Sequence, residues 1–77
     1  MRKIINGLRY DTEKSKLIGS VEHSFELYKT PNGRFFLLFW GGEIKPIMVG
    51  EAKAHYEELT DILVEYEDVF GESPKEA

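Results

Sequence analysis

The stretch RFFLLFW, residues 34–40, constrains this chain more than any other segment. Successive side chains of a strand point to opposite faces of a sheet, so this stretch places apolar groups on both. One face receives Phe35, Leu37 and Phe39, and the other receives Phe36, Leu38 and Trp40. A chain of 77 residues has room for one sheet and one helical layer. Either the N-terminal segment covers the second face, or that face is an exposed patch of the kind that marks an interface.

Residues 24–40 predict an antiparallel hairpin. The alternating segment 24–30 is followed by Pro31-Asn32-Gly33, in which proline fixes φ and glycine can adopt a positive φ. A three-residue turn of this kind places Thr30 opposite Arg34. The register then pairs Tyr28 with Phe36, Leu27 with Leu37, Glu26 with Leu38, Phe25 with Phe39 and Ser24 with Trp40.

The N-terminal region predicts a second hairpin. Asn6-Gly7 separates the short apolar segments 3–5 and 8–10, and this dipeptide suits a type I′ turn, which needs positive φ at both central positions. Asp11 and Glu13 resemble a carboxylate pair for acid–base chemistry. No nucleophile or histidine lies near them in the sequence, so we interpret Asp11-Thr12 as a turn.

The segments that flank the central hairpin are less regular. Residues 16–21 fit either a strand or an irregular connector. Residues 44–49 predict one more short strand, in which Pro46 is acceptable only at a sheet edge or a strand end.

Beyond residue 50 the apolar spacing changes from that of a strand to that of a helix. Spacings of four and three alternate along Ala52, Tyr56, Leu59, Leu63, Tyr66 and Phe70. An amphipathic helix over 50–70 would be about 30 Å long, whereas a strand of six or seven residues spans about 20 Å. The helix therefore overhangs the sheet or breaks. Thr60-Asp61 is the expected break, because threonine can cap a new helix.

These elements predict one α+β domain over residues 1–77. Residues 1–49 supply a meander of three to five antiparallel strands, residues 50–70 an acidic helical segment, and residues 71–77 a flexible tail after Gly71.

Charge divides the chain unequally. Residues 1–50 carry eight basic and five acidic side chains, a net charge of +3, whereas residues 51–77 carry two basic and nine acidic ones, a net charge of −7. No segment reaches the roughly 20 apolar residues of a membrane helix, and the first residues lack the apolar run of a signal peptide. We expect an intracellular protein with no membrane partner.

No catalytic, metal or cofactor motif is recognisable. The chain has no cysteine and two histidines, His23 and His55. With Glu22, Glu51 or Glu58 nearby they provide neither an HExxH nor a paired-histidine spacing, and zinc usually takes three or four ligands. Gly41-Gly42 lacks the phosphate-loop pattern. We therefore predict neither an enzyme nor a cofactor.

Two surfaces remain as candidate protein-binding sites. If the helix covers Phe25, Leu27, Leu37 and Phe39, the opposite face forms an aromatic patch of Tyr28, Phe36, Leu38 and Trp40. On the helix, carboxylates recur every seven residues opposite the apolar stripe, which is typical of a solvated face but also suits a basic partner. The predicted acidic contact residues are Glu57, Glu58, Asp61, Glu65 and Asp68.

Three stretches carry a resemblance: KIINGLRYDTEKSKLIG, ELYKTPNGRFFL and GEAKAHYEEL…YEDVFGE. Together they resemble a family of small, mostly uncharacterised bacterial and prophage proteins with the pattern KIINGKRYDTETA, then ETLYKTKNGRYFL, then an acidic helix ending in Phe-Gly. Leu8 stands where the family usually has a basic residue. The segment between the second hairpin and the helix is shorter in this chain than the family pattern leads one to expect. The resemblance implies phage or mobile-element origin and a counter-defence role of the anti-CRISPR type.

The sequence thus predicts a non-enzymatic protein-binding module that inhibits a bacterial defence protein with a basic surface, in the cytoplasm of the host cell. One alternative is a structural homodimer that uses the same aromatic face. The other is a weak single-stranded nucleic-acid binder with Lys29 and Arg34 beside the aromatic side chains. A net charge of only +3 makes nucleic acid the least expected partner.

Overall fold

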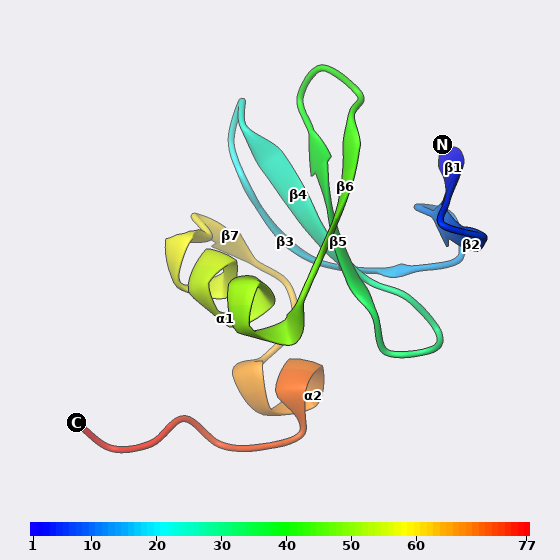
Figure 1. The fold of residues 1–77 in the computed structure, drawn as a ribbon. Helices are drawn as coiled ribbons and strands as arrows, with labels where there is room; N and C mark the ends of the chain where they lie inside the picture. Colours follow the sequence, from blue (N-terminus) through cyan, green and yellow to red (C-terminus); the bar gives the residue numbers. More distant parts are fainter.

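The computed structural model, which describes residues 1–77, is a five-stranded antiparallel sheet with a separate hairpin and two short helices (Figure 1). The strand order in the sheet is β6-β5-β4-β3-β7, and β1 pairs only with β2. The predicted α+β meander is therefore confirmed. The elements are β1 (Arg2–Ile5), β2 (Leu8–Asp11), β3 (Lys16–Val21), β4 (Phe25–Lys29), β5 (Phe35–Phe39), β6 (Ile44–Ile47), α1 (Val49–Glu58), β7 (Asp61–Ile62) and α2 (Tyr66–Phe70).

The hairpin of β4 and β5 has the predicted register. Phe25 pairs with Phe39, and Tyr28 pairs with Phe36. At the turn, the Thr30 amide donates to the Arg34 carbonyl oxygen at 2.8 Å, and Gly33 has a φ of 85°. The turn therefore sets the pairing register of β4 with β5, and the register decides which side chains of the two strands share a face.

Residues 16–21, which fitted two readings of the sequence, form strand β3. Its register against β4 shifts between Leu17 and Gly19, which is a bulge. A Cβ atom at Gly19 would overlap the Asp61 carbonyl oxygen and lie 2.8 Å from the Leu59 side chain. The glycine therefore allows β7 to approach β3 closely.

The C-terminal segment breaks where expected, but the predicted cap is wrong. Residues 50–70 do not form one helix, because α1 ends at Glu58 and Asp61–Ile62 pairs with β3. Thr60 does not cap a helix. Its amide and hydroxyl both donate to the Ser20 carbonyl oxygen, at 3.0 and 3.2 Å, since the edge of β3 offers that acceptor.

The strand predicted over 44–49 is also shorter than expected. β6 ends at Ile47, and Val49 already belongs to α1. The Met48 amide donates to Glu51 Oε1 at 2.9 Å, which satisfies a donor at the start of the helix. Pro46 lies on β6, an edge strand, as predicted.

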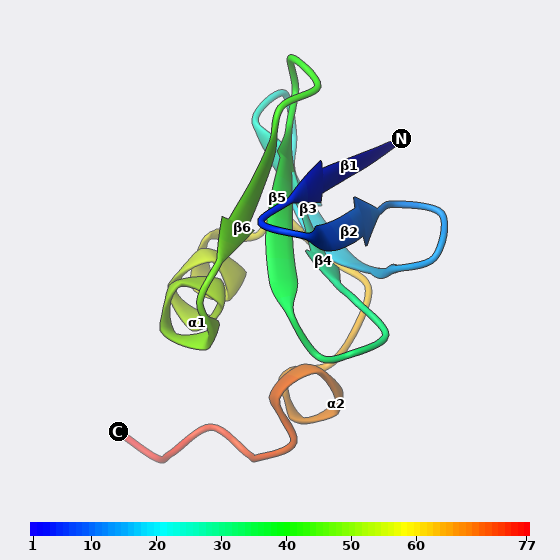
Figure 2. The ribbon, with the colours of Figure 1, turned by 45° about the vertical axis from the view of Figure 1, so that its right-hand side comes forward.

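The helices cover one face of the sheet, which we call the helix-side face (Figures 1 and 2). Phe25, Leu27 and Leu37 are buried there, as predicted, and Phe39 is half-buried against the same cluster. The cluster's nine buried members are Ile18, Phe25, Leu27, Phe35, Leu37, Ile47, Ala52, Leu59 and Val69.

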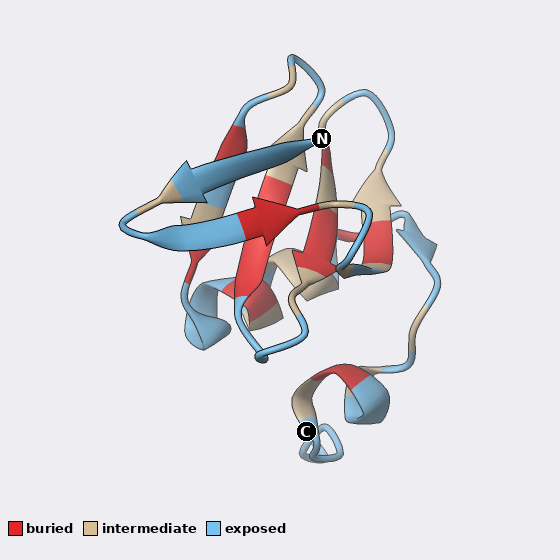
Figure 3. Ribbon diagram, turned by 90° about the vertical axis from the view of Figure 1, so that its right-hand side faces the viewer, coloured by how far each residue is buried: buried red, intermediate tan, exposed pale blue.

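The β1–β2 hairpin covers the other face, which we call the hairpin-side face (Figures 2 and 3). Its buried cluster is Tyr10, Tyr28, Phe36 and Ile44. The Phe36 ring stacks on Tyr28 with centroids 5.0 Å apart and meets Tyr10 edge-on at 5.5 Å. Of the two possibilities that RFFLLFW raised, cover by the N-terminal segment is thus the one observed over most of this face.

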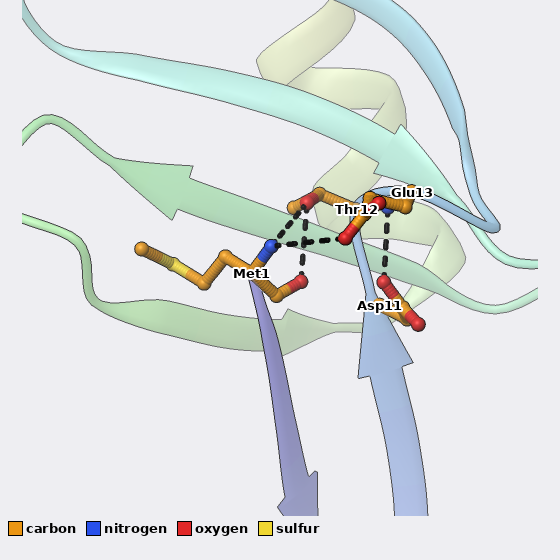
Figure 4. Close-up of polar contacts among 4 residues, drawn as sticks. All are labelled: Met1, Asp11, Thr12 and Glu13. Carbon is orange, nitrogen blue, oxygen red and sulfur yellow. Dashed lines mark hydrogen bonds and ion pairs between the residues drawn. The ribbon is translucent and has the colours of Figure 1, made fainter.

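Polar contacts fix the end of the β1–β2 hairpin (Figure 4). The Met1 amine donates to Thr12 Oγ1 at 3.1 Å, and the Thr12 amide donates to the Met1 carbonyl oxygen at 2.9 Å. Asp11 is buried, and its Oδ1 accepts the Glu13 amide at 3.0 Å. The turn interpretation of Asp11-Thr12 is confirmed. Neither helix of the structure has the length and apolar character needed to cross a membrane.

Candidate binding site

The hairpin-side face is not covered along its whole length. Towards the end of β5 its residues pass from Phe36, which is fully buried, through half-buried Leu38 to Trp40, which is 74% exposed. The turns that follow β3 and β5 lie at this same end of the sheet, at the top of Figure 1. This open end is where a large aromatic side chain meets solvent.

Two turns position the aromatic groups at the open end. The Trp40 amide donates to the Ser24 carbonyl oxygen at 2.8 Å, which extends the pairing of β4 with β5 by one step. His23, in the turn between β3 and β4, has a φ of 61°. Its ring meets Trp40 edge-on with centroids 5.0 Å apart. The Trp40 ring is therefore supported on one side and open on the rest.

A hollow of about 580 Å³ lies at this end of the sheet. Ser20 and Thr60 contribute to its lining from β3 and the segment before β7. Its lining also includes Glu22, His23, Glu26, Leu38, Trp40 and Asp61.

The hollow is acidic. Glu22, Glu26 and Asp61 come from a turn, from β4 and from β7, and none of the eleven residues that line the hollow is a lysine or an arginine. The only ion pair that any of the three makes joins Glu22 to His23, at 3.3 Å. Three carboxylates and an exposed indole thus line one hollow, and no basic residue lines it with them.

Glu26 links the hollow to the covered part of the same face. Its Oε1 accepts a hydrogen bond from the Tyr28 hydroxyl at 2.9 Å. Burial, reinforced by this carboxylate, raises the pKa of Tyr28 to about 12. Tyr28 is itself stacked on Phe36, so the buried cluster fixes the position of Glu26.

The hollow holds neither a hydrogen-bonded nucleophile nor a metal-binding cluster. Ser20 and His23 both line the hollow, but no hydrogen bond joins the Ser20 hydroxyl to a base, which an activated nucleophile requires. No group of three or more His, Asp or Glu side chains is placed to hold a metal ion. His55 pairs with Glu58 at 2.7 Å and packs edge-on against Phe25, but it does not itself line the hollow.

The predicted aromatic patch is partly wrong. Tyr28 and Phe36 are 8% and 0% exposed, because the β1–β2 hairpin covers them, so neither can present its ring to a partner or to a nucleic-acid base. Lys29, expected beside them, instead donates from Nζ to the Val69 carbonyl oxygen at 2.6 Å on the helix side. Leu38 and Trp40 remain at the surface of the hollow.

The acidic residues are exposed but do not share one helix face. The break at residue 60 divides them among different elements, so their seven-residue recurrence does not form a stripe. Glu57 and Glu58 end α1, Glu65 and Asp68 belong to the start of α2, and Asp61 lies in β7 at the hollow.

Sequence reasoning missed Glu22, His23 and Glu26 as site residues. The predicted register already contained a signal for them. It paired Glu26 with Leu38 and Ser24 with Trp40, which places the 22–26 segment beside Trp40. No protein-family model, curated protein or solved structure matches this chain.

Proposed function

We propose that this chain is a non-enzymatic protein-binding module that docks a basic partner at the open end of its sheet. The observation that carries the proposal is Trp40, a large aromatic side chain that is 74% exposed in a hollow with three carboxylates and no basic residue. Tryptophan is among the residues most enriched at the energetic centres of protein interfaces.

The surroundings of Trp40 favour a rigid contact site. The indole follows directly on β5 and is held by a backbone hydrogen bond and by the ring of His23. An anchor that is already ordered loses little conformational entropy when a partner binds.

The acidic C-terminal segment supplies a second, longer-range contribution. Glu57, Glu58, Glu65 and Asp68 are exposed, and residues 51–77 carry a net charge of −7. Such a field accelerates encounter with a positively charged surface and weakens as salt is added. Asp61 joins the two contributions, because it belongs to this segment and also lines the hollow.

The finer proposal is that the partner is a bacterial defence protein and that binding inhibits it, as an anti-CRISPR protein of a phage or mobile element does in the host cytoplasm. Its support is the resemblance of the N-terminal, central and C-terminal stretches to the prophage family described above. Expression in a bacterium with an active CRISPR–Cas system tests it, with plasmid or phage survival as the readout.

Affinity capture from a bacterial lysate, followed by mass spectrometry, tests the binding role. The baits are the natural chain, Trp40→Ala and Met48→Ala, since Met48 is also 74% exposed but does not line the hollow. A basic partner retained by the natural chain and by Met48→Ala, and lost by Trp40→Ala, is the expected result. Equal capture by all three baits, or by none, contradicts the proposal.

A structural homodimer is the second candidate, because further apolar side chains are exposed near the same end. Ile62 on β7 is 51% exposed, and the adjacent Leu63 is 58% exposed. Because β7 has only two residues, its edge offers few backbone groups for pairing with a second chain, so a dimer would rely on side-chain contacts. Light scattering over a hundredfold range of concentration separates the candidates. A stable dimer that Trp40→Ala dissociates would favour the homodimer.

A further inference from the structure

We propose that the hollow is an arginine site: it receives one arginine side chain of the partner, with the guanidinium group over the Trp40 ring and its N–H groups directed at the surrounding carboxylates. This inference rests on the proposed binding function and names the residue that the partner contributes. Its basis is the joint placement of Trp40, Glu22, Glu26 and Asp61 around one hollow.

The aromatic group suits a cation. Tryptophan has the most favourable ring face for a cation, and arginine also stacks on aromatic planes because its guanidinium group is flat. Trp40 is 74% exposed, and the one aromatic ring that contacts it, His23, meets it edge-on. A planar group can therefore still reach the indole.

The carboxylates suit an arginine better than a point charge. Glu26 and Asp61 lie in one row across the sheet, on either side of Ser20, and Glu22 comes from the turn after β3. Glu26 uses Oε1 for the Tyr28 hydroxyl, and its Oε2 accepts no hydrogen bond in the structure. A guanidinium group has five N–H donors in one plane and can serve several acceptors at once, whereas a lysine presents a compact ammonium group.

Size and charge argue against other occupants. A volume of about 580 Å³ accommodates one long side chain together with part of its own backbone. The carboxylates are not clustered closely enough to hold a metal ion. They would also repel the phosphate groups of a nucleic acid, which binds through Lys and Arg side chains that the hollow lacks.

The probes are three blocked pentapeptides with glycine on either side of a central arginine, lysine or citrulline, titrated into the full chain. Trp40 is the sole tryptophan, so its fluorescence reports on the hollow alone. We expect saturable binding of the arginine peptide, weaker binding of the lysine peptide, and binding of the citrulline peptide about tenfold weaker or absent, because citrulline keeps the shape and loses the charge.

Two double variants with the same change of net charge distinguish the effect of the carboxylates in the hollow from the long-range electrostatic effect of the protein's overall negative charge. Glu26→Gln/Asp61→Asn alters the hollow, and Glu57→Gln/Asp68→Asn removes two exposed carboxylates elsewhere. We expect the first to weaken the arginine peptide about tenfold and the second to change it less than twofold at physiological salt. Circular dichroism establishes that both variants are folded.

The outcomes are decisive for the arginine site. Equal binding of the arginine and citrulline peptides, equal loss in the two double variants, or no saturable binding would overturn it. So would a Trp40 spectrum that changes on dilution without peptide, since a second copy of the chain would then occupy the hollow. If the arginine peptide fails while lysate capture still depends on Trp40, the binding role stands and only the identity of the bound residue is wrong.

Discussion

The two ends of the hairpin-side face have the same kind of sequence and different surroundings. At one end Phe36 is fully buried between Tyr10 and Tyr28, under the β1–β2 hairpin. At the other end Trp40, four residues further along the same chain segment and directly after β5, is 74% exposed. Aromatic residues of one alternating stretch are therefore buried in the core at one end and exposed to solvent at the other.

The difference comes from the cover and not from the strand. The β1–β2 hairpin has only two strands of four residues, so it shields part of the face: its Met1 side chain reaches Gly42 in the turn after β5, and Trp40 stays 74% exposed (Figures 2 and 3). An apolar pattern shows that a face is suited to burial, and the extent of the covering element decides which residues are buried.

Phe36→Ala is expected to have the largest effect on stability. It removes a fully buried ring from the centre of the hairpin-side cluster, and a Phe→Ala change of this kind costs about 3–5 kcal/mol. Urea unfolding followed by circular dichroism measures the loss. A loss below about 1 kcal/mol would contradict the covered end as described.

Gly19→Ala tests whether β7 packs closely against β3 and so lines the open end of the sheet. The new Cβ would overlap the Asp61 carbonyl oxygen, a backbone atom, so β7 must move at a cost of about 1–3 kcal/mol. Hydrogen exchange at the Thr60 and Leu63 amides, which donate to β3, should accelerate. Gly41→Ala is the matched control, because nothing lies within 4 Å of its Cβ position. Unchanged exchange in Gly19→Ala would show that β7 is not seated on β3.

Tyr28→Phe tests the link between the two ends. It removes the hydrogen bond to Glu26, which contributes about 0.5–1.5 kcal/mol. Folding raises the pKa of Tyr28 from 10.0 to about 12, so it favours the protonated hydroxyl. The resulting stability is fully present below pH 10 and is lost as the pH rises through 12. Absorbance titration of tyrosinate should lose one component near pH 12 in the variant, and an unchanged titration would contradict the link.

Trp40→Ala should have the smallest effect on stability and the largest on binding. Substitutions of exposed residues usually change the free energy of unfolding by about 0.5 kcal/mol or less. The informative quantity is the difference between the losses in free energy of unfolding caused by Trp40→Ala and by Phe36→Ala under the same conditions. Similar losses for both variants would mean that Trp40 is packed and that the open end does not exist.

The sequence predicted the parts of the fold that local rules decide. The register of β4 with β5 followed from Pro31-Asn32-Gly33, and the alternation placed Phe25, Leu27 and Leu37 on one face, which the structure shows to be the helix-side core. Comparing the length of one long helix with that of a strand left an overhanging helix or a break near Thr60, and the structure shows the break. What Thr60 does instead depends on a distant acceptor, Ser20, which no local pattern reveals.

The candidate site was less predictable because it depends on which parts of the chain meet. Trp40 and Leu38 were recognised from RFFLLFW, but Tyr28 and Phe36 were assigned to the same patch because the position of the β1–β2 hairpin was unknown. Asp61 was assigned to a helical acidic face and lies instead in β7 beside the hollow, since the absence of a side chain at Gly19 admits that strand.

The sheet ends in an exposed indole within an acidic hollow, and collisional quenching of Trp40 fluorescence measures both the exposure and the charge. Caesium and iodide ions carry opposite charges, so carboxylates around the ring should favour the cation. At matched ionic strength we predict emission typical of a water-exposed indole and quenching by caesium that exceeds quenching by iodide, relative to free N-acetyltryptophanamide. Blue-shifted emission that resists both ions, or stronger quenching by iodide, would contradict the account.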